Sequence, residues 1–398
     1  MNEYEAPRPG DFHPADGRQP DVGKREVLEA ILVDDRPRRA RRRRRLPILL
    51  FLVTCFTTYA AGCYGWSFNP RSWFISQSAP ILVQKGDVYV DAEGHTKVAT
   101  MESRVVANWR DVLKFNWKDG LVYMGGVMLI LLFHEMGHFI MTLRYKVPAS
   151  FPFFIPVPFM VTGTMGAVIG MDPRGANRKQ VFDIGLAGPL AGLVLTIPLL
   201  VYGLSVAEPV PQISASPGYG DPLLVKMLIP ILHDLEEVKT NYAKDLKQSR
   251  IQHNLSIEAA AKAKRISVED WHKLESGNHE FTFMVNPIYM AAWVGMLVTG
   301  LNMLPISQLD GGHVSYALLG RHAYWLARAF LLVAIAFIVW TDSYNWTLML
   351  ILVLLIGIDH PPTADDTVKL GPWRYAVGLA SLAIPIFCFT PYPLILGG

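Results

Sequence analysis

The sequence HEMGH at residues 134–138 places two histidines and a glutamate inside an apolar stretch. On a helix, residues four positions apart lie on one face, so His134 and His138 can bind the same metal ion. Glu135 points in a neighbouring direction, where its carboxylate can accept a proton from a water molecule on that ion. Ionisable groups inside an apolar span are costly and by default mark a functional site. The pattern predicts metal-assisted hydrolysis at a Zn²⁺ ion held inside a membrane helix.

A hydrolytic zinc site normally has three protein ligands and a water molecule, so a third ligand is needed. One set of candidates lies in the polar segment 207–280. Counting the apolar spans described below puts this segment on the side of the membrane opposite to the HEMGH motif. These candidates are Glu236, Glu237, Glu258 and Glu269. Asp310 is the better candidate. It lies in NMLPISQLDGG at 302–312, where proline and glycines interrupt a helix and let the carboxylate turn inward. The topology brings this segment and the HEMGH helix to the same, cytoplasmic side.

The composition agrees with a membrane location. Hydrophobic residues make up 51% of the 398 residues and charged residues 18%, against about 25% charged in soluble domains. Apolar runs long enough to cross a bilayer predict about seven transmembrane helices, at 46–66, 120–143, 182–206, 281–304, 324–340, 346–358 and 375–389. Residues 148–170 are interrupted by prolines and glycines, which favours an extended or hairpin-like element near the membrane. The expected fold is an α-helical polytopic membrane protein with a small membrane-associated β element.

A block of eight arginines between Arg36 and Arg45 precedes the first apolar run. Arginines at this position hold the N-terminal side in the cytoplasm, and their adjacency to the span favours topology and lipid headgroups over nucleic acid. The predicted regions, in chain order, are a disordered cytoplasmic tail (1–45), a first transmembrane helix (46–66), an extracytoplasmic region (67–117), the HExxH half of a catalytic core (118–206), a helical extracytoplasmic insertion (207–280), the LDG half of the core (281–320) and C-terminal transmembrane helices (321–398).

An HExxH in a membrane helix with a downstream NxxPxxxLDG resembles the site-2 protease family of intramembrane zinc metalloproteases. The likeness covers residues 120–320. It implies that His134, His138 and Asp310 bind Zn²⁺, that Glu135 is the general base, and that Asn302 assists at the substrate carbonyl or transition state.

Further motifs are similar to the plastid and cyanobacterial branch of that family: GTMG at 163–166, NRK at 177–179 and FDIGLAGP at 182–189. In relatives, the segment before them forms a β element thought to align substrate as an added strand. No PDZ-like pattern lies between the two catalytic motifs, so gating by a PDZ domain does not carry over.

The expected activity is therefore hydrolysis of peptide bonds in or near the transmembrane segments of membrane proteins, within regulated intramembrane proteolysis. The expected partners are a transmembrane protein substrate and the lipid bilayer. The expected location is a bacterial inner membrane in preference to a plastid membrane, because the N-terminal segment contains many acidic residues and lacks a serine-rich transit composition. A metal transporter and a catalytically inactive scaffold remain alternatives. Glu135 argues against a transporter, which has no need of a base beside its ligands, and the intact motifs argue against a scaffold.

Three other polar residues near these motifs are interpreted as structural. His313 follows Asp310 by three positions; it could support the metal ligands, but a polar cap at a cytoplasmic helix start is the preferred interpretation. His360 precedes two prolines and is interpreted as a solvated loop residue. Asp183 is interpreted as a carboxylate suited to the positive end of a helix.

Overall fold

The computed structural model describes residues 45–65, 79–91, 95–101, 103–158, 160, 162–171, 173–211, 218–264, 266–278, 281–306, 308–341, 346–392 and 394–395. The predicted N-terminal tail, except for Arg45, and part of the predicted extracytoplasmic region lie outside these residues. Arg44–Gly398 forms one compact unit.

The described residues are mostly helical, and four of their helices are long and apolar enough to cross a membrane. These are α2 (Arg45–Cys63), α4 (Trp117–Tyr145), α5 (Arg178–Ser205) and the continuous stretch Asp310–Thr341, which comprises α11 (Asp310–Leu319), η3 (Gly320–His322) and α12 (Ala323–Thr341). Other apolar helices of the described residues are shorter, among them α10 (Pro287–Asn302), α13 (Thr347–Ile356), α14 (Pro372–Ser381) and α15 (Ile384–Cys388). The count of seven spans therefore stays a prediction.

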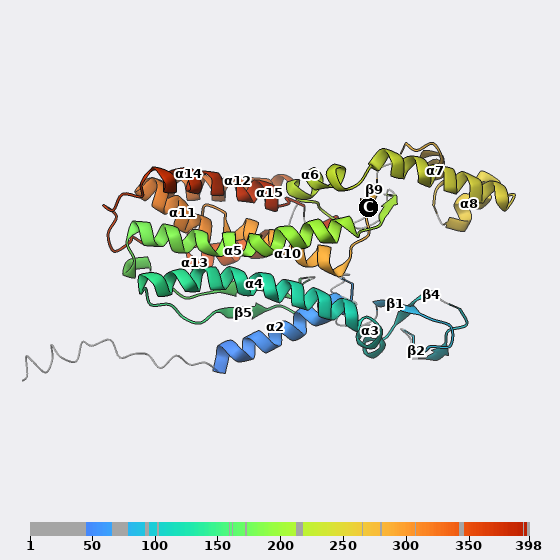
Figure 1. Ribbon diagram of the computed structural model, residues 1–398, viewed down its shortest axis with the longest axis horizontal. Helices are drawn as coiled ribbons and strands as arrows, with labels where there is room; N and C mark the ends of the chain where they lie inside the picture. Colours follow the sequence, from blue (N-terminus) through green and yellow to red (C-terminus); the bar gives the residue numbers. More distant parts are fainter. Residues whose placement is uncertain are drawn as a thin grey trace, which may run out of the picture. The chain divides into compact units, whose positions relative to one another are not determined.

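Helices α4, α5 and α10 pack against one another at the centre of this unit, and α2 packs on α4 (Figure 1). The shared core is apolar, and its fully buried side chains include Tyr123, Leu131 and Met290. Small residues set the helix spacing. A methyl group on Gly126 would meet the Ala291 side chain at 2.7 Å, and one on Gly137 would overlap the backbone of α5. Close backbone approach of this kind is typical of helices packed inside membranes.

The strands β5 (Phe153–Pro156) and β6 (Thr164–Val168) form an antiparallel hairpin with an irregular register. This is the hairpin-like element predicted for residues 148–170. It lies against α2, where the Phe51 and Phe154 rings meet edge to face at 5.1 Å. Gly163 turns the chain with φ +72°, and a side chain there would meet the Thr57 carbonyl oxygen at 2.6 Å. Only glycine combines this backbone conformation with so close an approach.

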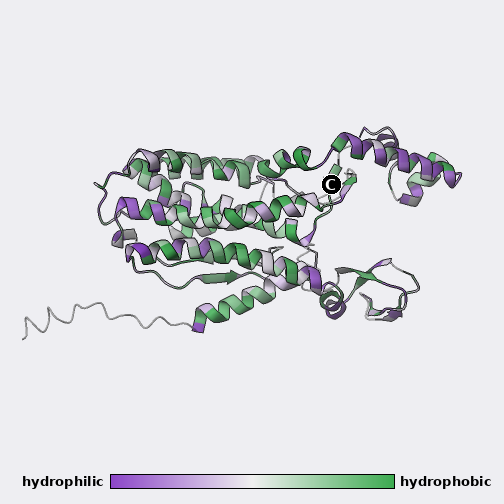
Figure 2. Ribbon diagram, viewed as in Figure 1, coloured by the Kyte–Doolittle hydropathy of each residue, from purple (hydrophilic) through white to green (hydrophobic). Residues whose placement is uncertain are grey.

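Two polar regions extend from the bundle, and both are less apolar than the helices at its centre (Figure 2). The first comprises β1 (Ala79–Val83) paired with β4 (Ser103–Ala107), β2 (Val88–Val90) paired with β3 (Thr96–Val98), and α3 (Trp109–Phe115). The second contains α7 (Leu235–Gln252), α8 (Ile257–Lys264) and α9 (Val268–Glu275), which enclose a small core around Trp271.

Short elements join the second region to the bundle. Its apolar first helix, α6 (Leu223–Leu232), packs on α5 and α15. The strand β7 (Pro209–Pro211) pairs with β9 (Phe281–Phe283), and β8 (Gly218–Tyr219) pairs with β10 (Leu394–Ile395). The start of segment 207–280 is thus part of the core packing.

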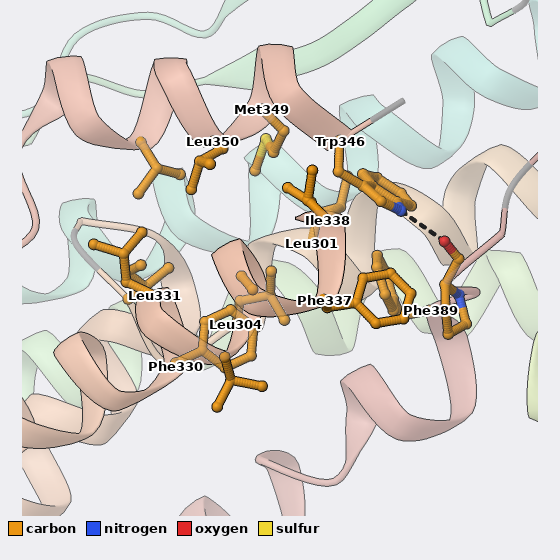
Figure 3. Close-up of a pocket in the computed structure, with 15 residues that line it drawn as sticks. Leu301, Leu304, Phe330, Leu331, Phe337, Ile338, Trp346, Met349, Leu350 and Phe389 are labelled. Carbon is orange, nitrogen blue, oxygen red and sulfur yellow. Dashed lines mark hydrogen bonds between the residues drawn. The ribbon is translucent and has the colours of Figure 1, made fainter. Parts of the chain in front are cut away.

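An apolar cavity of about 240 Å³ lies between α12, α13 and the end of α10 (Figure 3). Leu304, Phe337 and Leu350 are among its lining residues. At one end the Trp346 indole N–H donates to the Pro391 carbonyl at 2.7 Å.

Candidate metal centre

The residues of the two motifs meet at the contact between α4, α10 and α11. His134 and His138 lie one turn apart on α4, and Asp310 is the first residue of α11. The two Nε2 atoms are 3.2 Å apart. The Asp310 carboxylate oxygens lie 3.1 Å from the His134 Nε2 and 3.3 Å from the His138 Nε2. The structure thus brings the three predicted ligands together, although His134 and Asp310 are 176 positions apart in the chain.

Local sequence explains how Asp310 arrives there. The helix α10 ends at Asn302, and Pro305 cannot continue it. The chain then reverses and α11 begins. A side chain on Gly311 would overlap the backbone carbonyls of Met303 and Leu304. The glycine after the aspartate therefore lets the start of α11 fold back onto the end of α10.

The tautomer of His138 follows from its backbone partner. Its Nδ1 lies 2.8 Å from the Ile184 carbonyl oxygen of α5. A carbonyl oxygen only accepts, so Nδ1–H is the donor. In the neutral ring Nε2 then carries a lone pair that faces Asp310 and His134. A backbone carbonyl that fixes the far nitrogen in this way is the usual arrangement for a histidine that binds a metal.

The donor set fits a metal ion. Two imidazole nitrogens and one carboxylate converge, and one ligand atom from each lies within 4.8 Å of the others. Ligand atoms about 2.0–2.1 Å from one tetrahedral ion lie roughly 3.3 Å from each other. The separations of 3.1–3.3 Å match that figure. A cation at their centre would satisfy all three groups, which otherwise direct lone pairs and negative charge at one another.

Glu135 lies beside this set, and one of its carboxylate oxygens is left without a partner among the described residues. Its side chain is 2% exposed, and within the described part of the chain its Oε2 atom has no hydrogen-bond partner. A buried oxygen without a partner is costly in a folded protein, so an unpaired carboxylate here points to a partner that arrives with the reaction. Glu135 and the three ligand residues line one cavity of about 140 Å³.

Two further elements border the cavity. Asn302 lies at the end of α10, with its Nδ2 atom 3.3 Å from the His134 Nε2. On another side, the cavity is lined by Ala167 and Val168 of β6 and by Ile169. Among the described strands β6 pairs with β5 alone. The β hairpin thus contributes a wall of the cavity, and Asn302 lies within reach of a group bound beside the ligands.

The interpretation of His360 as a solvated residue was wrong, and His313 lies beside the predicted ligands, the alternative to a polar cap. His313 lines the cavity, and its Nδ1 lies 2.6 Å from the Nε2 of His360. His360 is half-buried and stacks on Tyr316 with ring centroids 4.4 Å apart. These residues are 47 positions apart, and no local pattern in the sequence marks the contact.

Asp183 takes part in an ion pair. Both of its oxygens accept from Arg374 of α14, at 2.8 and 3.0 Å, and one also accepts from the Tyr145 hydroxyl at 2.5 Å. This network joins α4, α5 and α14.

Comparison with known proteins places the chain in a family. The model of Peptidase family M50 matches residues 122–339, which include the HEMGH helix, Asn302 and Asp310. The chain belongs to peptidase family M50, the site-2 protease family. No solved structure matches it.

Curated relatives agree with this M50 assignment. The chain is 28% identical over 268 residues to "Probable zinc metalloprotease EGY1, chloroplastic" of Oryza sativa subsp. japonica, covering 67% of this chain and 40% of the relative. It is 27% identical over 262 residues to the Arabidopsis thaliana protein of the same name, covering 65% of this chain and 41% of the relative. It is 26% identical over 282 residues to "Probable zinc metalloprotease EGY2, chloroplastic" of Arabidopsis thaliana, covering 71% and 43%. The chain thus spans about two fifths of the length of these relatives. Their plastid type agrees with the predicted branch.

Proposed function

We propose that this M50 protein is an integral membrane zinc metalloprotease that hydrolyses peptide bonds in or near the transmembrane segments of other membrane proteins. His134, His138 and Asp310 bind Zn²⁺, Glu135 is the general base, and Asn302 assists at the substrate carbonyl. The observation that carries the proposal is the buried Glu135 side chain, whose Oε2 atom lacks a hydrogen-bond partner among the described residues and which borders the same cavity as three converging ligand atoms.

A bound zinc ion would lower the pKa of a water ligand toward about 7 and polarise a carbonyl group. The chain's own residues supply the remaining chemistry. Glu135 accepts a proton from the attacking water and delivers it to the leaving nitrogen, a role for which its free oxygen is available. Asn302 donates from its amide to the oxygen on which negative charge develops.

The substrate must be extended to be cut, because helical amides are hydrogen-bonded and shielded. The β6 strand supports this step, since it borders the cavity and pairs only with β5 among the described strands. An unwound substrate segment adds to β6 as a further strand, held by backbone hydrogen bonds. The partners of the protein are then a transmembrane protein substrate and the lipid bilayer.

The wider setting is part of the proposal. Seven spans with a cytoplasmic N-terminus place the HEMGH and LDG motifs toward the cytoplasm, and cleavage there belongs to regulated intramembrane proteolysis. The proposed location is a bacterial inner membrane, and a plastid membrane is the alternative, because the names of the relatives place those proteins in chloroplasts.

The test measures zinc content and cleavage of a tagged single-span substrate by the purified full chain. Glu135→Gln should keep its zinc and lose about 10²–10⁴-fold in cleavage rate, the usual contribution of a general base. Glu236→Gln, an identical change at the exposed start of α7, is the matched control and should leave both quantities unchanged.

Each failure has a different meaning. Undiminished cleavage by Glu135→Gln would remove Glu135 from the mechanism. Zinc binding without cleavage by the unaltered chain would favour the metal transporter. A chain that binds no zinc would favour the inactive scaffold.

A further inference from the structure

The loop between α13 and α14 contacts α11 and the start of α5, the two helices that pack against the histidines of α4. We call residues 360–367 the clasp loop. It lies beyond residue 339, where the match to the M50 model ends. One side of the loop contacts α11, which begins with Asp310, and the other contacts the start of α5, which supplies the Ile184 carbonyl to His138.

On the α11 side, the hydrogen-bond directions can be assigned. The His360 Nδ1 lies 2.6 Å from the Pro361 carbonyl, so Nδ1–H is the donor and the neutral His360 ring can only accept at Nε2. His313 therefore donates its Nδ1–H to His360 across 2.6 Å. One turn further along α11, Tyr316 stacks on the His360 ring and donates its hydroxyl to Asp366 at 2.8 Å.

On the α5 side, the contacts are to backbone. The Ala364 N–H donates to the Ala176 carbonyl at 2.9 Å, and the Arg178 N–H donates to the Asp365 carbonyl at 3.1 Å. The Arg178 guanidinium then donates to the Ala317 and Leu318 carbonyls at the end of α11, at 2.6 and 3.1 Å. The start of α5, the helix α11 and the clasp loop form one connected network.

The opposite side of α11 leaves no room for movement. A methyl group on Gly185 of α5 would lie 2.7 Å from the His313 Cβ. His313 is thus held between α5 and the clasp loop, and it is three residues, about one helical turn, from Asp310. Displacement of His313 would carry Asp310 away from His134 and His138.

We propose that His360 is a positioning residue for the metal centre: it holds His313, and through it the first turn of α11, so that Asp310 stays against the two histidines. This inference rests on the proposed metal site. Groups that orient metal ligands without touching the ion typically contribute 10–100-fold to metal affinity.

The test uses the purified full chain and Zn²⁺ alone, in competition with a chromophoric chelator. His360→Ala removes the acceptor and the stacking ring, and His360→Phe keeps a stacking ring without an acceptor. His360→Gln provides an amide oxygen that can accept from His313. His253→Ala, on the exposed end of α7, is the matched control.

His360→Ala and His360→Phe should weaken Zn²⁺ binding about 10–100-fold, while His360→Gln should stay within about threefold of the unaltered chain. His253→Ala should have no effect. Unaltered affinity in His360→Phe, or equal losses in His360→Phe and His360→Gln, would overturn the proposal. This comparison decides the matter even where His360→Ala does not fold.

A second readout separates this inference from the proposed function. Amide hydrogen exchange of the metal-free chain over residues 310–319 should be faster in His360→Phe than in the unaltered protein, and the amides of α4 should be unaffected. If the unaltered chain binds no Zn²⁺, the proposed function is wrong. The positioning role of His360 is wrong if amide exchange over residues 310–319 is the same in His360→Phe and in the unaltered protein.

Discussion

Gly188 provides a graded steric test of the metal centre. A methyl group on Gly188 would overlap the His138 imidazole, with Nε2 as the nearest atom. At Gly192, one turn along the same helix, a methyl would meet the His134 Nδ1 at 3.2 Å, and at Gly125 on α4 it would meet nothing within 4 Å. Alanine can thus be introduced against the His138 ring at Gly188, beside the His134 ring at Gly192, and in open space at Gly125.

The three alanine substitutions should change stability and Zn²⁺ affinity by different amounts. Glycine to alanine in a helix interior normally stabilises by up to about 1 kcal/mol, which is the result we expect for Gly125→Ala. Overpacking costs about 1–3 kcal/mol, and His138 can relieve the overlap at Gly188 only by turning its Nε2 away from the site. We expect Gly188→Ala to lose at least about 100-fold in Zn²⁺ affinity, roughly 3 kcal/mol. Gly192→Ala should stay within about tenfold, because a contact of 3.2 Å needs only a small shift.

The assay is Zn²⁺ affinity of the three purified variants by chelator competition, with thermal unfolding measured in parallel. Unaltered affinity in a folded Gly188→Ala variant would refute the placement of His138 against α5. Equal losses of Zn²⁺ affinity in Gly125→Ala and Gly188→Ala would show that replacing a helical glycine is enough to cause the loss. The overlap with the His138 imidazole would then not be its cause.

Three other predictions follow from described contacts. Asp183→Asn or Arg374→Ala should lower the thermal unfolding temperature by a few degrees (about 1 kcal/mol) and leave Zn²⁺ affinity unchanged, and loss of zinc would contradict a purely structural role. Gly163→Ala should reduce cleavage while zinc content is kept, because its side chain would push the β hairpin off the Thr57 carbonyl; full cleavage by a folded variant would argue against the hairpin's role. Burial lowers the pKa of His360 from 6.5 to about 4. Since the unfolded chain binds that proton more readily, stability should be full above pH 6.5 and fall by up to about 3 kcal/mol toward pH 4. Denaturant unfolding of His360→Gln across this range should show a smaller decrease than that of the unaltered chain.

The sequence predicted best what depends on local pattern. Apolar length alone located α2, α4 and α5 within a few residues. Counting the apolar spans predicts that the HEMGH and LDG motifs lie at the same side of the membrane and can meet. In the structure the His134 Nε2 lies 3.1 Å from an Asp310 carboxylate oxygen. The prolines and glycines of 148–170 predicted an irregular element, and the hairpin is there.

Features that depend on tertiary contact were not predictable in the same way. The apolar run at 281–304 predicts one span, but in the structure β9 precedes the helix, which begins at Pro287 after an Asn286 cap. That Asn-Pro pair is a helix-start signal and could have set the boundary. The contact of His313 with His360 had no such signal, because it depends on how the clasp loop lies on α11.

The separation of 176 positions between His134 and Asp310 has a consequence for biosynthesis. While α4 is entering the membrane, the segment that carries Asp310 has not been translated, and the clasp loop emerges later still. The proposed ligand set therefore stays incomplete on the ribosome until most of the chain has been made. Chains interrupted before that point would carry both histidines but not Asp310, so the proposed cleavage would require a nearly complete chain.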